Sequence, residues 1–328
     1  MLGGVQLRRP VWNLGSVNAS FDNIFSPGYS DSEIGDHIHD VFLAKVDDYL
    51  AFCPIDRAAI DHWKNLICTA LGSDVVVRGG LDIVDIGSGG GTSVFPMAEL
   101  TPASHVIATD LSIPLLLQIR RVALREGYTN LALVQMNAED MIFADAQADI
   151  VMGANILHHA LSLPGVFAEV RRILKPGGVA VFWEPFEDGG QLIAGIFDLW
   201  MEMDHYRTEH LQAEVVSAMR AFTVDLQRRV GRSKPAGVLQ TLDDKWWFSK
   251  QHIADLACGA EFSQCNIRNI YGSHNVIQNM TDHELRRWGF SLDSVPLWAR
   301  EKLLAVQSRF SDDYLQGHPF SASVVMRP

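Results

Sequence analysis

The feature that most constrains this chain is a short apolar run that ends in a cluster of glycines. Residues 81–86 read LDIVDI, and four of these six side chains are Leu, Ile or Val, which is typical of a strand buried on both faces. Glycines follow from residue 87 to residue 91, and residues 93–100 resume with a spacing suited to a helix. Glycines let a ligand approach the backbone closely, and free N–H groups at a helix start attract negative charge. The stretch therefore predicts a strand, a tight turn and a helix that bind a nucleotide-like ligand.

The spacing of the glycines distinguishes between two kinds of cofactor. A dinucleotide fingerprint, G-x-G-x-x-G, that began at Gly87 and Gly89 would need its third glycine at Thr92. The sequence instead follows D-x-G-x-G-x-G, from Asp85 to Gly91. A carboxylate just before the first glycine is unfavourable beside a pyrophosphate, but it suits a ligand that carries an ammonium and a sulfonium group. In this motif the chain resembles the class I S-adenosylmethionine-dependent methyltransferases, whose first motif has the same form.

The rest of the chain alternates strand patterns with helix patterns. Apolar runs predict further strands at residues 105–110, 131–134, 148–152, 179–183, 264–271 and 321–326. Strands that alternate with helices at this pitch require a parallel sheet. The resemblance implies a doubly wound, Rossmann-like α/β fold. Its mostly parallel seven-stranded sheet would have an antiparallel last strand, and helical cap and lid insertions would be added to it.

The pattern also predicts how the chain is divided. Residues 1–72 are expected to form an N-terminal helical cap, and residues 73–186 the cofactor-binding part of the methyltransferase core. Residues 187–248 are helical and rich in Trp, Met and His, and they are expected to be a lid insertion. Residues 249–328 are expected to complete the core, with a second helical insertion at 272–318.

Composition narrows the classes of partner. The net charge is −12, and adjacent basic residues occur only as pairs, which disfavours a nucleic-acid substrate. The cysteines form no C-x-x-C pair, the N-terminus has no apolar leader, and no run reaches the length of a membrane span. These features predict a reduced, soluble, cytoplasmic protein that acts on a small molecule, with no nucleic-acid or membrane partner. The sequence is also compatible with a homodimer.

The resemblance implies which residues bind S-adenosyl-L-methionine. Asp110 ends the second strand, where an acid can accept hydrogen bonds from both ribose hydroxyls, although it could instead cap the next helix. The family's adenine motif falls at residues 137–141, where Asn137 replaces the usual Asp; its amide oxygen can still accept a hydrogen bond, and Asp140 is the alternative. The full predicted set is Asp85, Gly87, Ser88, Gly89, Gly91, Asp110, Leu111, Asn137, Ala138, Asp140 and Asn155.

Three side chains are candidates for catalysis. His158 and His159 follow the fourth strand, close to the expected position of the methyl group, and the reference pKa of imidazole lies near neutrality. Glu184 ends the fifth strand at the same edge, where it can orient a histidine, accept a proton or hold an amine. The alternative for each is structural: packing and capping for the histidines, and backbone hydrogen bonds for the glutamate.

No metal site is predicted. His37 and His39 are the obvious pair, but on a helix two residues that are separated by one position point about 200° apart. Ligands that share a metal on one helix need a spacing of three or four residues, so this pair does not converge.

The sequence therefore predicts an S-adenosylmethionine-dependent methyltransferase that acts on an oxygen, nitrogen or carbon nucleophile of a small organic molecule. A second interpretation is an enzyme that keeps the cofactor fold but catalyses a cyclisation or a decarboxylation. A non-catalytic cofactor-binding subunit is disfavoured by the intact acid and glycines. An NAD-dependent oxidoreductase is disfavoured by the order of the acid and the glycines.

Overall fold

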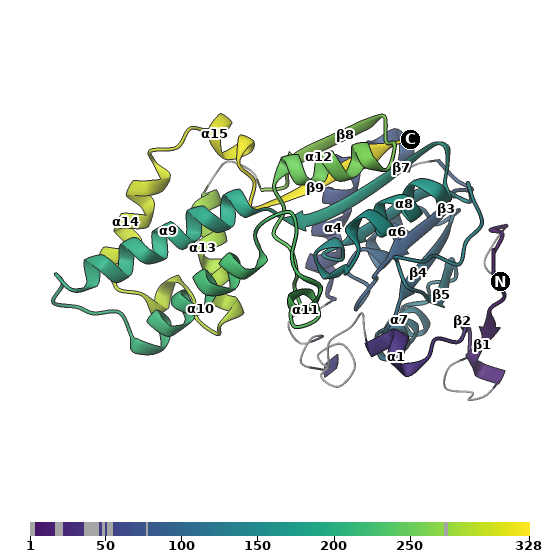
Figure 1. The fold of residues 1–328 in the computed structure, drawn as a ribbon, viewed down its shortest axis with the longest axis horizontal. Coiled ribbons are helices and arrows are strands. Elements are labelled where there is room, and N and C mark those ends of the chain that lie inside the picture. Colours follow the sequence, from purple (N-terminus) through teal and green to yellow (C-terminus); the bar gives the residue numbers. More distant parts are fainter. Residues whose placement is uncertain are drawn as a thin grey trace.

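The computed structural model describes residues 4–16, 22–35, 46–47, 50, 55–76, 78–271 and 275–328. Over these ranges the chain forms one sheet flanked by helices and, beside it, a lobe made only of helices (Figure 1). His37 and His39 lie outside the described residues. Within the expected N-terminal cap, the structure describes a short helix, α1 (Asp31–Gly35).

Nine strands of the described residues form the sheet, in the order β1-β2-β5-β4-β3-β6-β7-β9-β8. The strands are β1 Trp12–Asn13, β2 Ile24–Ser26, β3 Asp82–Ile86, β4 His105–Asp110, β5 Leu131–Gln135, β6 Ala148–Ala154, β7 Leu174–Pro185, β8 Gln264–Asn269 and β9 Ser321–Arg327. Neighbours from β2 to β7 are parallel, whereas β9 is antiparallel to both β7 and β8. The doubly wound sheet and its antiparallel last strand are thus confirmed.

Two details of the sheet differ from the prediction. β1 and β2 extend the sheet beyond β5, giving nine strands rather than seven; they are too short to show a strand period in the sequence. β7 begins at Leu174 instead of residue 179, because Ala148 pairs with Leu174 and Ile150 with Val179. The residues between these two pairs bulge out of the ladder.

Helices cover both faces of the sheet and build a separate apolar core on each. α4 (Arg57–Leu71), α6 (Val94–Leu100) and α7 (Ile113–Glu126) pack on one face, and α8 (Leu163–Ile173) and α12 (Lys250–Gly259) on the other. The alternation along β3 divides its side chains between the faces, with Ile83 in the first core and Val84 and Ile86 in the second. Shorter helical segments are η1 Leu14–Ser16, α5 Ser73–Val76, η3 Leu157–His159, α11 Ala236–Leu239 and η4 Leu292–Ser294.

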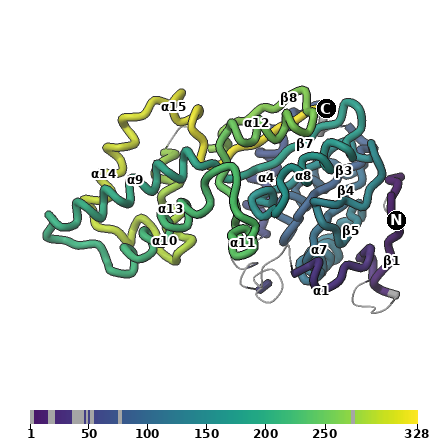
Figure 2. The backbone as a smooth tube through the Cα atoms, in the orientation of Figure 1, coloured from purple at the N-terminus to yellow at the C-terminus, as the bar shows by residue number. Residues whose placement is uncertain are grey.

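The two predicted insertions pack together as one helical lobe. The first supplies α9 (Glu187–Asp204) and α10 (Ala213–Arg229), and the second supplies α13 (Val276–Arg287), α14 (Leu297–Gln307) and α15 (Asp312–Gly317). Their shared apolar core includes Phe197, Trp200, Phe222, Met280 and Leu303. The chain enters the lobe after β7, returns through α11 to α12, and enters it again between β8 and β9 (Figure 2). Among the described residues there is no helix that is both long and apolar enough to cross a membrane.

Candidate functional site

A cavity of about 1000 Å³ lies between the sheet and the helical lobe. On the sheet side it is lined by residues that follow the carboxyl ends of β3, β4, β5 and β6, which is where open α/β sheets bind ligands. These lining residues include most of the predicted cofactor set: Gly87, Ser88, Gly89, Asp110, Leu111, Asn137, Ala138 and Asn155. On the lobe side the lining comes from the ends of α10 and α13 and from the segment before α12.

The turn after β3 has a backbone conformation that requires glycine. Gly87 and Gly89 have φ angles of 59° and 52°, in the left-handed region that side chains with a Cβ rarely adopt. A Cβ on Gly87 would lie 2.2 Å from Cδ1 of Ile156. The N–H of Gly89 donates to Oδ2 of Asp110 at 2.9 Å, which ties the turn to the end of β4. The glycine motif thus keeps bare backbone at the cavity wall.

Asp85 lies behind this turn and does not line the cavity. Its carboxylate is fully buried and accepts hydrogen bonds from the hydroxyls of Ser88 and Ser93, both at 2.6 Å. Burial raises the pKa of Asp85 to about 7. The carboxylate therefore holds the turn and the start of α6, which differs from the predicted contact with a ligand ammonium group. Gly91 also lies outside the lining.

Asp110 caps the start of α7 and also lies where it could accept from ribose hydroxyls. Its Oδ1 accepts from the N–H of Ser112 at 2.8 Å, at the start of α7, and its Oδ2 accepts from Gly89. The side chain also lines the cavity, and each carboxylate oxygen has a second lone pair for a hydroxyl donor. Burial raises the pKa of Asp110 to about 6, against the opposing effect of these backbone hydrogen bonds.

The two candidates for the adenine contact separate in the structure. Asn137 lines the cavity, and its main-chain N–H donates to the hydroxyl of Tyr29 at 2.9 Å. Asp140 lies outside the lining and forms ion pairs with Arg8 and Arg9. The carboxylate of Asp140 is thus paired with Arg8 and Arg9. Asn137 is the candidate for the adenine contact that faces the cavity.

The catalytic candidates meet in and behind the wall of the same cavity. Nδ1 of the buried His158 lies 2.7 Å from Oε2 of Glu184. The other oxygen of Glu184 accepts from the N–H groups of Ile156 at 2.9 Å and Leu157 at 2.8 Å. Glu184 is itself buried behind the cavity wall, so it orients His158 and the turn after β6 instead of facing the cavity. His159 lines the cavity next to His158.

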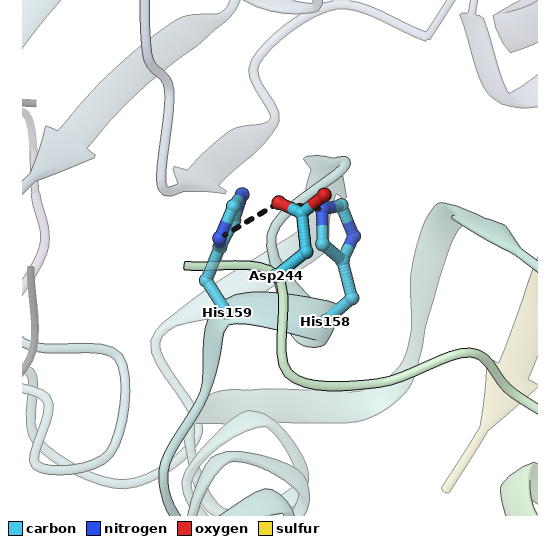
Figure 3. A group of neighbouring side chains, drawn as sticks. All are labelled: His158, His159 and Asp244. Carbon is cyan, nitrogen blue, oxygen red and sulfur yellow. Dashed lines mark ion pairs between the residues drawn. The ribbon is translucent and has the colours of Figure 1, made fainter. Parts of the chain in front are cut away.

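Asp244 completes this group, and sequence reasoning missed it. Its Oδ1 lies 3.5 Å from Nε2 of His158 and 3.6 Å from Nδ1 of His159 (Figure 3). The main-chain N–H of Lys245 donates to the carbonyl of His158 at 2.6 Å and so fixes Asp244 beside the histidines. The position of Asp244 beside the histidines depends on the path by which the chain returns from the lobe. No local pattern in the sequence indicates that path.

Two arginines from the lobe hold the other oxygen of Asp244. Nη2 of Arg229 lies 3.0 Å and Nη2 of Arg287 lies 3.3 Å from Oδ2. Burial opposes ionisation of Asp244, but His158 and Arg229 outweigh it and lower its pKa well below the usual range. Burial and the neighbouring His158 lower the pKa of His159. Burial opposes protonation of His158, but Glu184 and Asp244 outweigh it and raise its pKa. The group therefore combines an ionised Asp244 carboxylate with a neutral His159 imidazole at neutral pH.

Comparison with known proteins identifies the core of the fold. Residues 83–178, which carry the glycine turn, Asp110 and the two histidines, match the sequence profile of the methyltransferase domain family. This segment of the chain is thus similar to methyltransferase domains. The helical lobe lies outside the matched residues.

The relatives with curated names match part of this chain. The chain is 36% identical over 98 residues to a malonyl-[acyl-carrier protein] O-methyltransferase of Xylella fastidiosa, covering 30% of this chain and 32% of that protein. It is 29% identical over 140 residues to a demethylmenaquinone methyltransferase of Tropheryma whipplei, covering 43% and 54%. The match thus spans about a third to a half of these relatives' own length.

Among solved structures, phosphoethanolamine N-methyltransferase 2 of Haemonchus contortus aligns with 80% of this chain and 52% of its own, at 14% identity and a TM-score of 0.48. A likeness this distant does not bear on function.

Proposed function

We propose that this protein transfers a methyl group from S-adenosylmethionine to an oxygen, nitrogen or carbon nucleophile of a small organic molecule. One observation supports this most directly. A single cavity joins the glycine turn of a methyltransferase domain to a buried histidine and carboxylate group beneath a helical lobe. The curated relatives named above are methyltransferases, but the match covers only 30% and 43% of this chain. The family profile ends at residue 178, before the lobe, where substrate specificity would lie.

The lining on the sheet side fits this cofactor. Backbone at Gly87 and Gly89 allows close approach, Asp110 offers acceptors for ribose hydroxyls, and Asn137 offers an amide for adenine. We place the methionine part near Asn155, next to the turn that carries His158. When bound, the cofactor supplies a methyl carbon that is already activated by the adjacent positive sulfur.

The protein's own contribution is orientation, exclusion of water and control of one proton. Because Nδ1 of His158 is directed at the Glu184 carboxylate, its Nε2 faces the cavity side and Asp244. In this tautomer Nε2 can accept a proton from a substrate hydroxyl, amine or acidic carbon. Glu184 then stabilises the imidazolium and acts as a positioning residue.

The remaining proposals concern partners and the lobe. The net charge of −12 supports a small-molecule substrate over a nucleic acid. A cytoplasmic location and a homodimer are compatible with the sequence. The predicted division at residues 72, 186 and 248 remains a proposal, with the lobe serving as the wall that closes the substrate cavity.

The test is to incubate the protein with methyl-labelled S-adenosylmethionine and pooled small-molecule metabolites, and to measure S-adenosylhomocysteine together with labelled products. We expect both to form in equal amounts, and both to be lost in Asp110→Asn. A product that forms without S-adenosylhomocysteine would support the cyclisation or decarboxylation alternative. Failure of S-adenosylhomocysteine to bind at all would refute the proposed function.

A further inference from the structure

The group formed by His158, His159 and Asp244 has the composition of a transition-metal site. Each residue offers one ligand atom, and the three atoms lie within 4.8 Å of one another. The histidines come from the turn after β6, and Asp244 reaches them from the segment that leaves the lobe (Figure 3). All three side chains line the cavity that also holds the glycine turn and Asp110.

The spacing of these atoms suits metal ligands better than hydrogen-bond partners. Oδ1 of Asp244 lies 3.5 Å from His158 and 3.6 Å from His159. A charge-assisted hydrogen bond between such groups is shorter, about 2.7–2.9 Å. Ligand atoms at about 2.0–2.1 Å from a tetrahedral zinc ion are roughly 3.3–3.4 Å apart. One oxygen that faces two imidazole nitrogens at this distance leaves room for an ion between them.

The surrounding residues orient these ligands in the way metal sites require. Glu184 holds Nδ1 of His158 at 2.7 Å, so Nε2 is the nitrogen left for a metal. Arg229 and Arg287 hold only Oδ2 of Asp244 and leave Oδ1 toward the histidines. Nδ1 of His159 also lies 3.0 Å from the main-chain oxygen of Asp243, a contact that metal binding would exchange for a coordinate bond.

The two arginines do not cancel the charge of the Asp244 carboxylate. Arg229 is also paired with Asp225 at 2.6 Å, and Arg287 with Glu284 at 3.4 Å. Each guanidinium is therefore shared between Asp244 and a second carboxyl group. Lys245, the next residue along the chain, directs its ammonium group to the main-chain oxygens of Leu242 and Asp243. A cation can thus be accommodated at Oδ1.

We propose that His158, His159 and Asp244 bind one divalent transition-metal ion in the wall of the cavity, with open coordination positions for a substrate oxygen. Two imidazoles and one carboxylate favour Zn²⁺, Fe²⁺ or Co²⁺ over Mg²⁺ and Ca²⁺, which prefer oxygen ligands. The only pair weighed as metal ligands from the sequence was His37 and His39, and Asp244 is remote from His158 and His159 in the chain. The part that concerns substrate rests on the proposed methyl transfer and replaces its proton step: with Nε2 of His158 bound to the ion, His158 no longer accepts the substrate proton, and the ion instead holds an oxygen nucleophile and lowers its pKa.

The experiment is a titration of tag-free, chelator-treated full-length protein with Co²⁺ alone, followed by calorimetry and by visible absorption. We expect one equivalent to bind and to give the absorption of nitrogen- and oxygen-coordinated cobalt. His159→Gln and Asp244→Asn should each weaken binding at least about tenfold, the effect that even outer-sphere changes have at metal sites. His105→Gln is the matched control, because this exposed histidine lies on β4 outside the cavity lining, and it should bind Co²⁺ as the unaltered protein does.

Asp244→Asn also removes the partner of two arginines, so its circular-dichroism spectrum must match that of the unaltered protein. If the spectrum of Asp244→Asn differs, His159→Gln alone tests the site. The proposal is overturned if the unaltered protein takes up no Co²⁺, or if His159→Gln binds it as tightly. A parallel titration of the metal-free protein with S-adenosylhomocysteine separates the two proposals: binding there, without Co²⁺ uptake, supports the cofactor site and rejects the metal.

Discussion

At the scale of single residues, Asp110 connects the glycine turn to the cavity and is the most direct probe of the cofactor. Asp110→Asn keeps the size of the side chain but removes its charge. We expect binding of S-adenosylhomocysteine to weaken by about 1–3 kcal/mol, the value typical of hydrogen bonds to charged groups. Calorimetric titration measures the change. Unaltered affinity would remove Asp110 from the ribose contact.

The same carboxyl predicts a pH dependence of cofactor binding. Burial raises the pKa of Asp110 to about 6, and the ionised form is the one that accepts two hydroxyl donors. Affinity should therefore be full above this pKa and fall as pH drops through it, by about tenfold between pH ~7.5 and pH ~5. Asp110→Asn cannot ionise and should bind with nearly constant affinity over this range. An equally steep decline in the variant would assign the dependence to another group.

At the scale of elements, the turn between β3 and α6 is tested by a pair of glycine substitutions. Gly89 and Gly177 have φ angles of 52° and 79°, so valine strains the backbone at either position, by roughly 1–2 kcal/mol. Only Gly89 lines the cavity, and Gly177 lies in the bulge of β7 with nothing close to its added Cβ.

Gly89→Val should abolish binding of S-adenosylhomocysteine, whereas Gly177→Val should retain it despite a similar loss of thermal stability. Titration and thermal unfolding of both variants check this. Equal loss of binding in the two variants would mean that backbone strain alone, and not occupation of the cavity, is responsible.

Elements differed in how well the sequence predicted them. Strands such as β3 and β4 are apolar runs bounded by turn residues, so their period and position could be read directly. β2 forms by pairing with β5 at the edge of the sheet, and β1 forms by pairing with β2. Their own residues do not indicate these tertiary contacts. A cap decides where α4 begins: the helix starts after Asp56, whose side chain accepts a hydrogen bond from the N–H of Ala59.

The residues of the site differ in the same way: some follow from local sequence motifs, and others depend on tertiary contacts. The Asp110 position and the Gly87 turn follow from local motifs, so their place in the cavity wall could be predicted. Asp85 accepts hydrogen bonds from the hydroxyls of Ser88 and Ser93, which the motif alone does not reveal, and its contact with the cofactor stays a prediction. Asp244 was missed because the lobe alone brings it to the histidines.

At the scale of the whole molecule, the junction between sheet and lobe bears on how the cavity opens. Three of the crossings at this junction are made by Phe186, Phe248 and Phe320, all of which are buried. Backbone hydrogen bonds join the crossings: Phe186 N–H to the carbonyl of Phe320 at 2.7 Å, and Phe248 N–H to that of Pro185 at 3.1 Å. A lobe with its own core and a bonded junction is better suited to be a fixed wall than a swinging lid.

The segment before Asp244 is the better candidate for movement. Residues 231–241 are mostly exposed, yet Thr241 and Leu242 line the cavity. We therefore expect S-adenosylhomocysteine to slow amide hydrogen exchange within residues 231–245, while Phe186 and Phe248 are already protected in the free protein. Mass-spectrometric exchange, with peptides from the core of α9 as the internal control, measures this. If α9 and the junction gain protection as strongly as residues 231–245, the whole lobe closes over the cofactor and the fixed wall is wrong.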